Sequence, residues 1–299
     1  MASPQYEKLV RILWERRVAG GSHPVEALRA GMAAVALPAG DDVTATPVDA
    51  GGIPAEWVRA GDREGDGVIL YLHGGGYVMG SLLTHRKLAG DLARASGARV
   101  LLLDYRLAPE HALPAGIDDG VAAYRWLLAE GVEPAKIAIG GDSAGGGLTV
   151  AVLLALRDAG IALPGAGVCI SPWANLMLDA PSIETRADRD PVVNRQSLQR
   201  FRDWYVAGTD PRAALASPVF ADLRGLPPLL IHVGDAEILL DDARALADRA
   251  EASGVDVTLE IWPDMVHVWH IFAGRVPEAT AAVERIGAFL TERLAVSPV

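Results

Sequence analysis

The chain has 299 residues, 51% of them hydrophobic, so it is long enough to bury a large core. Its formal net charge is −11, with 27 Lys and Arg against 38 Asp and Glu, and no basic run stands out, which argues against binding to nucleic acid or to an anionic membrane surface. The one cysteine, Cys169, excludes an intrachain disulfide and lies in an apolar run, GAGVCISPW, where we expect a small buried side chain.

The N-terminal stretch MASPQYEKLVRILWERR carries charges throughout and has no apolar core of the kind found in secretory signals. The longest uncharged stretch, AGIALPGAGVCISPWANLML, is interrupted by Pro164, Pro172 and several glycines, so we expect a loop, a buried strand and another loop there. These features predict a cytoplasmic protein without a membrane span.

Two amphipathic helices are expected near the start, in QYEKLVRILWERRV and PVEALRAGMAAVA, followed by an antiparallel strand pair within 43–60. Apolar strands then alternate with helical segments. The expected strands cover 68–75, 98–107, 136–142, 165–173, 227–235 and 257–264, and the expected helices cover 85–97, 116–131, 143–160, 238–254 and 278–295. Near-continuous apolar strands alternating with helices predict an α/β fold, with a mainly parallel sheet covered by helices on both faces.

Two segments do not follow this alternation: the N-terminal helical segment, 1–42, and the charged segment 176–215, which contains the amphipathic SLQRFRDWYVAG. Both are expected to pack over the carboxyl edge of the sheet, where open α/β folds bind ligands. We therefore divide the chain into an N-terminal helical segment, 1–42, and an α/β domain, 43–299, in which 176–215 is an addition over the same edge.

A glycine-rich stretch, GGDSAGGG, joins one predicted strand to the next helix and could be a phosphate cradle, a tight turn or the site of a nucleophile. No Lys-Ser or Lys-Thr follows the glycines, and neither this stretch nor HGGGYVMG gives G-x-G-x-x-G, which argues against phosphate binding. The residues Gly141-Asp142-Ser143-Ala144-Gly145 match G-x-S-x-G at a strand-to-helix junction, the context which that motif requires. Ser143 is therefore the candidate nucleophile, with its hydroxyl exposed by a strained bend.

A second glycine run, His73-Gly74-Gly75-Gly76, follows the strand VILYL. A tetrahedral oxyanion needs two or three N–H donors in fixed positions, and glycines let the backbone approach it closely. We expect the N–H groups of Gly74, Gly75 and Ala144 to form this oxyanion hole.

A nucleophilic serine needs a base. His267 lies beyond the last predicted strand, in WPDMVHVWH, which suits the chain order serine, acid, histidine. His270 is its rival, and we expect one of the two to be structural. His232 lies within a strand and His23 lies near the start of a helix.

The base needs an acid to orient it, and HVGDAEILLDD offers four carboxylates after a strand. Asp241 and Asp242 fall inside the predicted helix, where a solvent-exposed face is expected. Local pattern alone leaves both Asp235 and Glu237 open.

Taken together, these motifs resemble those of the hormone-sensitive-lipase-like esterase family of α/β hydrolases. The resemblance covers roughly residues 70–272 and rests on HGGGYVMGS, DYRLAPEHALPA, GDSAGGGL, SPWANL, GDAEILLDD and DMVHVWHIF. It implies an α/β-hydrolase fold with an eight-stranded sheet and a helical cap, so that 43–299 is the catalytic domain, 1–42 is an N-terminal helical cap segment and 176–215 contributes a second cap segment. It also implies hydrolysis of short-acyl esters without a metal or a cofactor.

The resemblance assigns the nucleophile to Ser143 and the base to His267. The family's acid is usually the first aspartate of Asp-x-x-x-Asp, and here that spacing falls on Glu237 and Asp241, so Glu237 takes the acid position and Asp235 is the reserve. The extra methylene of glutamate needs only a small backbone shift.

The family signature YRLAPEH is structural, so Arg106, Glu110 and His111 are expected to organise loops below the site. Candidates for the acyl pocket come from the two cap segments, although a core role is also open to each. They are Trp14, Met177, Phe201 and Trp204.

Other functions stay open. An amidase or a deacetylase of a specific metabolite would use the same residues. A catalytically inactive small-molecule receptor on this fold is the alternative from another class, and the presence of both Ser143 and His267 argues against it.

The histidines are too scattered to suggest a metal site. The strand 257–264 is expected at the edge of the sheet, where it could pair two copies into a homodimer.

Overall fold

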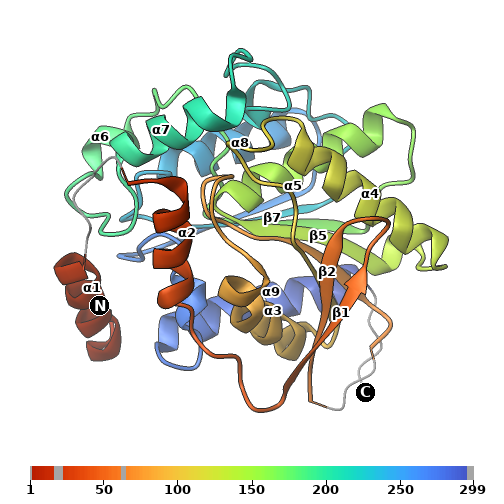
Figure 1. The fold of residues 1–299 in the computed structure, drawn as a ribbon, viewed down its shortest axis with the longest axis horizontal. Helices are drawn as coiled ribbons and strands as arrows, with labels where there is room; N and C mark the ends of the chain where they lie inside the picture. The colour runs from red at the N-terminus through yellow and green to blue at the C-terminus, as the bar shows by residue number, and fades with distance from the viewer. Residues whose placement is uncertain (1, 17–22, 62–64, 295–299) are drawn as a thin grey trace.

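The fold is taken from a computed structural model that describes residues 2–16, 23–61 and 65–294. Its strands are β1 (Val43–Asp49), β2 (Pro54–Ala60), β3 (Val68–Leu72), β4 (Arg99–Leu103), β5 (Ile137–Asp142), β6 (Ala166–Ile170), β7 (Leu229–Gly234) and β8 (Val257–Trp262). They form one sheet in the order β1-β2-β4-β3-β5-β6-β7-β8 (Figure 1), in which β2 is antiparallel to both neighbours and the others run parallel. This confirms the predicted eight-stranded, mainly parallel sheet and its antiparallel lead-in pair.

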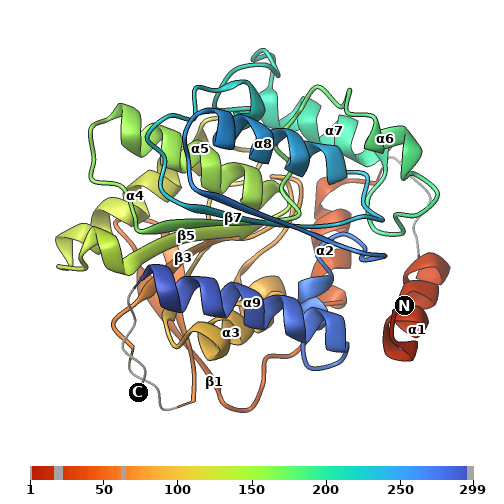
Figure 2. The ribbon, with the colours of Figure 1, turned by 180° about the vertical axis from the view of Figure 1, so that it is seen from behind.

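Helices cover both faces of the sheet, as predicted. The α-helices are α1 (Pro4–Arg16), α2 (Val25–Ala34), α3 (Leu82–Ser96), α4 (Ala115–Ala129), α5 (Ala144–Asp158), α6 (Ser182–Thr185), α7 (Arg195–Val206), α8 (Leu240–Ala252) and α9 (Pro277–Arg293). Short 3₁₀ helices are η1 (Pro134–Lys136), η2 (Pro218–Phe220) and η3 (Trp269–Phe272). Helices α3 and α9 lie on one face, and α4, α5 and α8 lie on the other (Figures 1 and 2).

The central strands are apolar runs buried at every position, as expected for strands with helices on both faces. Cys169 of β6 is one of these buried side chains, and burial raises the pKa of its thiol to about 12. Parallel pairing places Leu72 beside Gly141 and Gly234 beside Trp262, so the carboxyl ends of β3, β5, β7 and β8 share one edge. The chain leaves this edge through the loops that carry the candidate site residues.

Several elements differ from the predicted boundaries. The strand expected at 165–173 ends at Ile170, because Ser171 takes a left-handed φ of 47°. The helix expected at 85–97 begins three residues earlier, because Ser81 and Thr84 form a capping box. The helical ends expected at 17–18 and at 295 lie outside the described residues.

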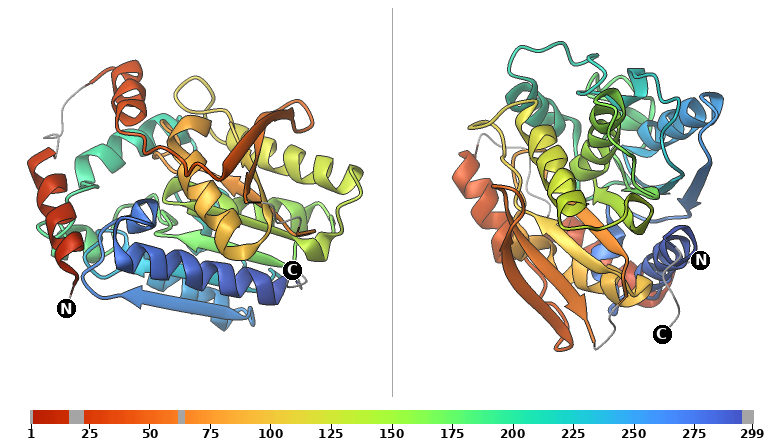
Figure 3. Two further views of the ribbon diagram at one scale, coloured as in Figure 1. Left: turned by 90° about the horizontal axis from the view of Figure 1, so that it is seen from below. Right: turned by 90° about the vertical axis from the view of Figure 1, so that its right-hand side faces the viewer.

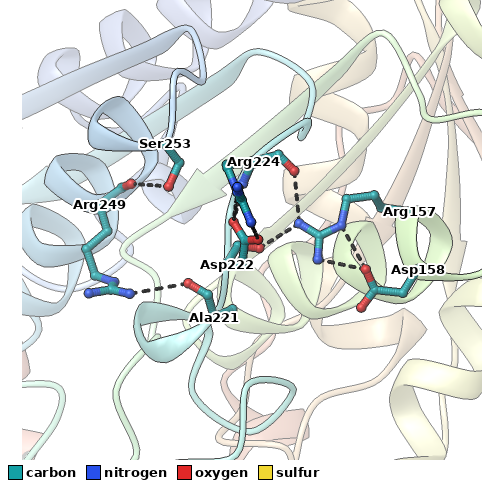
Figure 4. Close-up of polar contacts among 7 residues, drawn as sticks. All are labelled: Arg157, Asp158, Ala221, Asp222, Arg224, Arg249 and Ser253. Carbon is teal, nitrogen blue, oxygen red and sulfur yellow. Dashed lines mark hydrogen bonds and ion pairs between the residues drawn. The ribbon is translucent and has the colours of Figure 1, made fainter.

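The segment between η2 and β7 is hydrogen-bonded to two helices, α5 and α8, on one face of the sheet (Figure 4). At the end of α5, the Arg157 guanidinium donates to the carbonyl oxygens of Asp222 (2.6 Å) and Arg224 (3.0 Å). From α8, Arg249 donates to the carbonyl oxygen of Ala221 (3.3 Å). These bonds fix the start of β7, the strand that leads to the candidate acid.

Strand β8 ends the sheet, and Glu260 on it accepts a hydrogen bond from Arg285 of α9 (2.5 Å). Its side chains are partly exposed, with Ile261 the most exposed apolar one at 36%. The position of β8 at the edge agrees with the sequence, and the homodimer through it stays a prediction. Within the described ranges, no helix is both long enough and apolar enough to cross a bilayer.

Candidate active site

Ser143 forms a sharp bend between β5 and α5. Its backbone has φ 55° and ψ −120°, a conformation that residues other than glycine rarely adopt. The Ser143 N–H donates to the Ile170 carbonyl oxygen (2.8 Å), and the Ser143 carbonyl oxygen accepts from the Trp173 N–H (2.9 Å). In the described part of the chain its side chain forms no cap bond to α5. The backbone contacts with Ile170 and Trp173 therefore stabilise this strained conformation, and the Ser143 hydroxyl does not cap α5.

Two glycines allow β5 and α5 to cross at this bend. A Cβ added at Gly145 would collide with the Leu72 carbonyl oxygen, and one added at Gly141 would collide with the same oxygen and with that of Gly145. The close crossing at Ser143 therefore requires glycine on both sides, as the motif predicts.

Glu237 and His267 lie in contact. Glu237 follows β7, is fully buried, and accepts a hydrogen bond on Oε2 from His267 Nδ1 (2.8 Å). Its Oε1 accepts two more, from the Gly234 N–H and the Ser171 hydroxyl, each at 2.7 Å. Three donors therefore fix this carboxylate in one orientation, and its contact with Nδ1 leaves His267 Nε2 as the nitrogen available for proton transfer.

His267 is 6% exposed, and burial by itself lowers the pKa of an imidazole. The hydrogen bond that His267 donates to Glu237 and the negative charges of Glu237 and Asp190 outweigh that effect, so the pKa of His267 is raised above its ordinary value. The imidazolium form is therefore stabilised beside these carboxylates.

The structure does not show a formed bond between the candidate nucleophile and base: within the described residues, no hydrogen bond joins the Ser143 hydroxyl and His267. Both lie at the carboxyl edge of the sheet, after β5 and β8. Catalytic hydrogen bonds of this kind are often long before substrate binds.

Asp235, the reserve acid, is engaged elsewhere. Its Oδ1 accepts from the Asp264 N–H (2.7 Å) and lies 3.2 Å from Arg189 Nη2. It does not cap α8, which begins at Leu240 without a side-chain cap. Two roles are open to Asp235 beside a Glu237 acid, holding the turn or capping the helix, and the structure shows the first of them, at the turn after β8.

Asp241 and Asp242 do not form the solvent-exposed face expected of them. Asp241 accepts from the Ser182 N–H (2.8 Å). Asp242 is 1% exposed and accepts from the N–H groups of Ala174 (3.2 Å) and Asn175 (2.9 Å). Burial raises the pKa of Asp242 to about 8. The first turn of α8 packs on the loop after β6, which explains why these carboxylates are not free.

His270, the rival base, points away from this pair. It is fully buried, and its Nε2 lies 3.2 Å from Nδ1 of His232, which is on β7. Burial and the neighbouring histidine lower the pKa of His270 well below its ordinary value. His23, the other alternative, is exposed, and its carbonyl oxygen accepts a hydrogen bond from Arg200.

The glycine loop after β3 differs from expectation at one position. The Gly74 N–H donates to Asp142 Oδ1 (3.0 Å), a buried carboxylate that also accepts from the Tyr71 hydroxyl (2.8 Å). Gly74 is therefore not free to bind an oxyanion, and its predicted role is wrong in this structure. Among the described residues, the N–H groups of Gly75, Gly76 and Ala144 donate to no protein acceptor.

Of the pocket candidates, Phe201 lies nearest to this loop. A Cβ added at Gly76 would collide with the Phe201 ring, so α7 packs directly on the glycine loop. Trp204 lies beside Phe201, with ring centroids 6.2 Å apart. Met177, on the loop after β6, and Trp14, on α1, are partly buried, and their predicted place in the acyl pocket stays a prediction.

The signature YRLAPEH acts through ion pairs, which agrees with a structural role. Arg106 binds Asp119 of α4 through two nitrogens (2.6 and 2.9 Å). Glu110 binds Arg29 of α2 through both oxygens (2.7 Å each), and this hydrogen bonding lowers the pKa of Glu110 to about 2. His111 is exposed.

Two residues near the site are absent from the sequence prediction. The Ser171 hydroxyl donates to Glu237 and accepts from the Val268 N–H (3.2 Å), so it links the acid loop to the histidine loop. Asp190 is fully buried and accepts from the Ile238 N–H (3.0 Å), next to Glu237. Ser171 lies in the motif SPWANL, so the sequence held a signal for this residue. No motif in the sequence pointed to Asp190.

Over the described ranges, no group of three or more His, Cys, Asp or Glu side chains could hold a metal ion.

Known proteins are similar to this chain in sequence. The sequence model of the alpha/beta hydrolase fold family matches residues 69–271. An acetyl-hydrolase from Streptomyces hygroscopicus is 47% identical over 297 residues, which cover 97% of each chain. An esterase from Acinetobacter venetianus is 35% identical over 259 residues, which cover 85% of this chain and 84% of its own.

Solved structures are also similar. An esterase from the bacterial hormone-sensitive lipase family, 49% identical, superposes with a TM-score of 0.95 over 98% of this chain and 99% of its own. The esterase EstE5, from crystals soaked with p-nitrophenyl butyrate, is 50% identical and superposes with a TM-score of 0.96 over 98% of this chain and 100% of its own.

Proposed function

Since this chain belongs to the hormone-sensitive-lipase-like family of α/β hydrolases and is an esterase, we propose that it hydrolyses short-acyl esters through an acyl-enzyme on Ser143. The buried hydrogen bond between Glu237 and His267 carries the proposal, because it fixes one imidazole tautomer and leaves Nε2 to accept a proton. The strained backbone of Ser143 supports the nucleophile assignment.

In the first half of the reaction, Ser143 Oγ attacks the ester carbonyl carbon while His267 Nε2 takes the hydroxyl proton. The tetrahedral intermediate collapses, the bond to the alcohol oxygen breaks, and His267 returns the proton to the leaving alcohol. Water then attacks the acyl-enzyme in the same way, which releases the acid and restores Ser143. Glu237 accepts the Nδ1 hydrogen bond and stabilises the imidazolium throughout.

We assign the oxyanion to the N–H groups of Gly75, Gly76 and Ala144. The engagement of Gly74 with Asp142 supports this set, since it excludes the first glycine and anchors the loop that carries the next two. Ala144 is the first residue of α5, where the helix dipole also favours a negative charge. Donors held in this way need no rearrangement as the charge develops.

The segments 1–42 and 176–215 are proposed to cap the site. Contact of Phe201 with the glycine loop supports an acyl pocket bounded by α7. The soak of EstE5 with p-nitrophenyl butyrate and the name of the Streptomyces relative both suggest short acyl groups as substrates here. That name does not specify the acetyl bond that is cleaved, so a deacetylase acting on amides is the second candidate.

An acyl-length series of p-nitrophenyl esters, run beside acetylated amides, tests the substrate class, and intact-protein mass spectrometry tests for an acyl-enzyme. Ser143→Ala should lower kcat by roughly 10⁶, as loss of the serine does in a triad hydrolase. A purified Ser143→Ala protein that keeps a tenth of the turnover would remove Ser143 from this role. Faster cleavage of amides than of esters would favour the deacetylase.

A further inference from the structure

One side chain of the N-terminal helix is inserted into the body of the protein. Tyr6 is the buried residue of α1, at 3% exposure, and it belongs to the same apolar cluster as Met265, Val266 and Trp269. Partly buried leucines of α1 pack on that cluster as well. Figures 2 and 3 show α1 at one end of the molecule, beside the start of α9.

The Tyr6 hydroxyl makes two hydrogen bonds to the loop that carries His267. It donates to the Asp264 carbonyl oxygen (2.7 Å) and accepts from the Val266 N–H (2.8 Å). Burial raises the pKa of Tyr6 far above its ordinary value, so the hydroxyl stays neutral and keeps both bonds. The second of these bonds ends one residue before His267.

The loop 264–268, which carries His267, requires contacts with other segments to keep its conformation. Asp264 and Val268 both take left-handed backbone conformations, with φ 65° and 50°, and His267 lies between them. Non-glycine residues hold such conformations only where surrounding contacts fix them. Asp235 binds the start of the loop and Ser171 binds its end, at the Val268 N–H. Tyr6 binds the middle, immediately before the imidazole.

We infer that Tyr6 is a positioning residue for the esterase reaction: its hydroxyl, held between Asp264 and Val266, fixes the loop that presents His267 to Glu237 and Ser143. This inference rests on the proposed function. It gives α1 a role besides covering the site, because the helix contributes a contact on which the geometry of the base depends. Small displacements of a catalytic group have large effects on turnover, about 10²-fold for 1 Å.

Tyr6→Phe tests the inference, because it keeps the ring and its packing and removes both hydrogen bonds. With a p-nitrophenyl ester as substrate, we expect kcat to fall about tenfold while KM hardly changes, since the loop is displaced and the acyl pocket is not. The acid limb of kcat/KM should also move to lower pH. The raised pKa of His267 depends on its hydrogen bond to Glu237, and a looser loop weakens that bond.

The pH readout separates positioning from stability. The carboxylates that act on His267 are Glu237, Asp190 and Asp142, and Tyr6→Phe changes none of them. A shift of the acid limb therefore reports the imidazole geometry. A variant that melts at a lower temperature but keeps the wild-type kcat and pH profile would overturn the inference.

Glu278→Ala is the matched control. Glu278, at the start of α9, accepts from the Ser3 N–H (2.5 Å) and the Ser3 hydroxyl (2.8 Å), so the substitution releases the other anchor of α1 and leaves the Tyr6 contacts in place. It should leave kcat unchanged. If it lowers kcat as much as Tyr6→Phe does, docking of the helix as a whole matters and the specific role of Tyr6 is excluded.

Two further measurements complete the test. In the unmodified protein, the Val266 amide should exchange hydrogen as slowly as the buried amides of β7; exchange at the rate of an exposed loop would overturn the inference even if Tyr6→Phe does not fold. Ser143→Ala is assayed in parallel. Full turnover by Tyr6→Phe beside an inactive Ser143→Ala rejects the role of Tyr6 alone, whereas an active Ser143→Ala rejects the proposed function and this inference with it.

Discussion

His267 and His270 lie three residues apart and are both buried, yet their pKa values move in opposite directions. His267 contacts Glu237, and Asp190 adds a second negative charge, so its pKa rises despite burial. His270 faces His232, so burial and a neighbour of the same kind both lower its pKa. Burial therefore does not decide which histidine can act as a base. The side chain that each imidazole contacts, Glu237 for His267 and His232 for His270, decides whether it can act as a base.

The largest expected effect comes from removing that partner from His267. Glu237→Gln should lower kcat by roughly 10⁴, because the imidazole can then take the wrong tautomer. Asp235→Asn is the matched control. It changes a partly exposed ion pair with Arg189, and the new amide oxygen can still accept from the Asp264 N–H. Steady-state kinetics on both variants make the comparison. An inactive Asp235→Asn beside an active Glu237→Gln would transfer the acid role to Asp235.

Acid should destabilise the protein through its neutral histidines. Burial and the neighbouring His85 lower the pKa of His73 to about 3, and burial lowers those of His232 and His270. The unfolded chain binds protons near pH 6.5 and the folded chain does not, so this stability is complete above pH 6.5 and is lost as pH falls toward 3. His73 alone accounts for on the order of 5 kcal/mol.

Urea unfolding at pH 7.5 and at pH 5 measures this loss. The three histidines should lower the midpoint at pH 5. The raised pKa values of His267 and Asp242 oppose this trend, since their contributions are present at low pH and are lost as pH rises through their folded values. The measurement is therefore repeated on Asp242→Asn, which removes one of these two opposing groups. Equal midpoints at the two pH values in that variant would contradict the neutral state of the three rings.

His270→Ala should separate the two histidines by their roles. It removes a fully buried ring whose Nδ1 has no hydrogen-bond partner among the described residues, and we expect a loss of stability of roughly 2 kcal/mol from the cavity. The kcat should stay within a few-fold of the wild type, because the ring does not contact Glu237. Melting temperature and turnover measured on one sample test both statements; loss of turnover without loss of stability would make His270 the base.

The smallest expected effect comes from Asp190, the second carboxylate whose charge raises the pKa of His267. Asp190→Asn removes a negative charge that acts on His267, so the pKa of His267 should fall and the acid limb of kcat/KM should move to lower pH by about half a unit to one unit. Glu237 and Asp142, the other carboxylates that act on the ring, are not altered by this substitution. An unchanged acid limb would mean that Glu237 alone sets the charge state of His267.

The fold and two members of the candidate triad were predictable because their signals are local. A strand, G-x-S-x-G and a helix lie in one stretch around Ser143, and His267 follows the last strand. Glu237 needed the family spacing, since the pattern alone did not separate it from Asp235. The capping box at Ser81 was also local, but the predicted start of the helix missed it.

The errors and omissions have a common physical cause. The Gly74 N–H binds Asp142, 68 residues away, and no pattern around the glycine run indicates that contact. Ser171 reaches Glu237 across 66 residues, and Tyr6 reaches Val266 across 260. Contacts of this kind arise from the arrangement of the whole chain, so they could be found only in three dimensions.

The anchoring of α1 also has a consequence for the order in which the protein is completed. A ribosome makes α1 before the sheet, but the hydrogen-bond partners Asp264, Val266 and Glu278 lie 258 to 275 residues later in the chain. In the nascent protein, the helix therefore cannot form these hydrogen bonds until nearly all of the sheet has been synthesised. Contacts so distant in sequence form late and slowly. Docking of α1 is therefore expected late in folding, because the loop that holds His267 gains its contact with Tyr6 only after residues 264–266 have been synthesised.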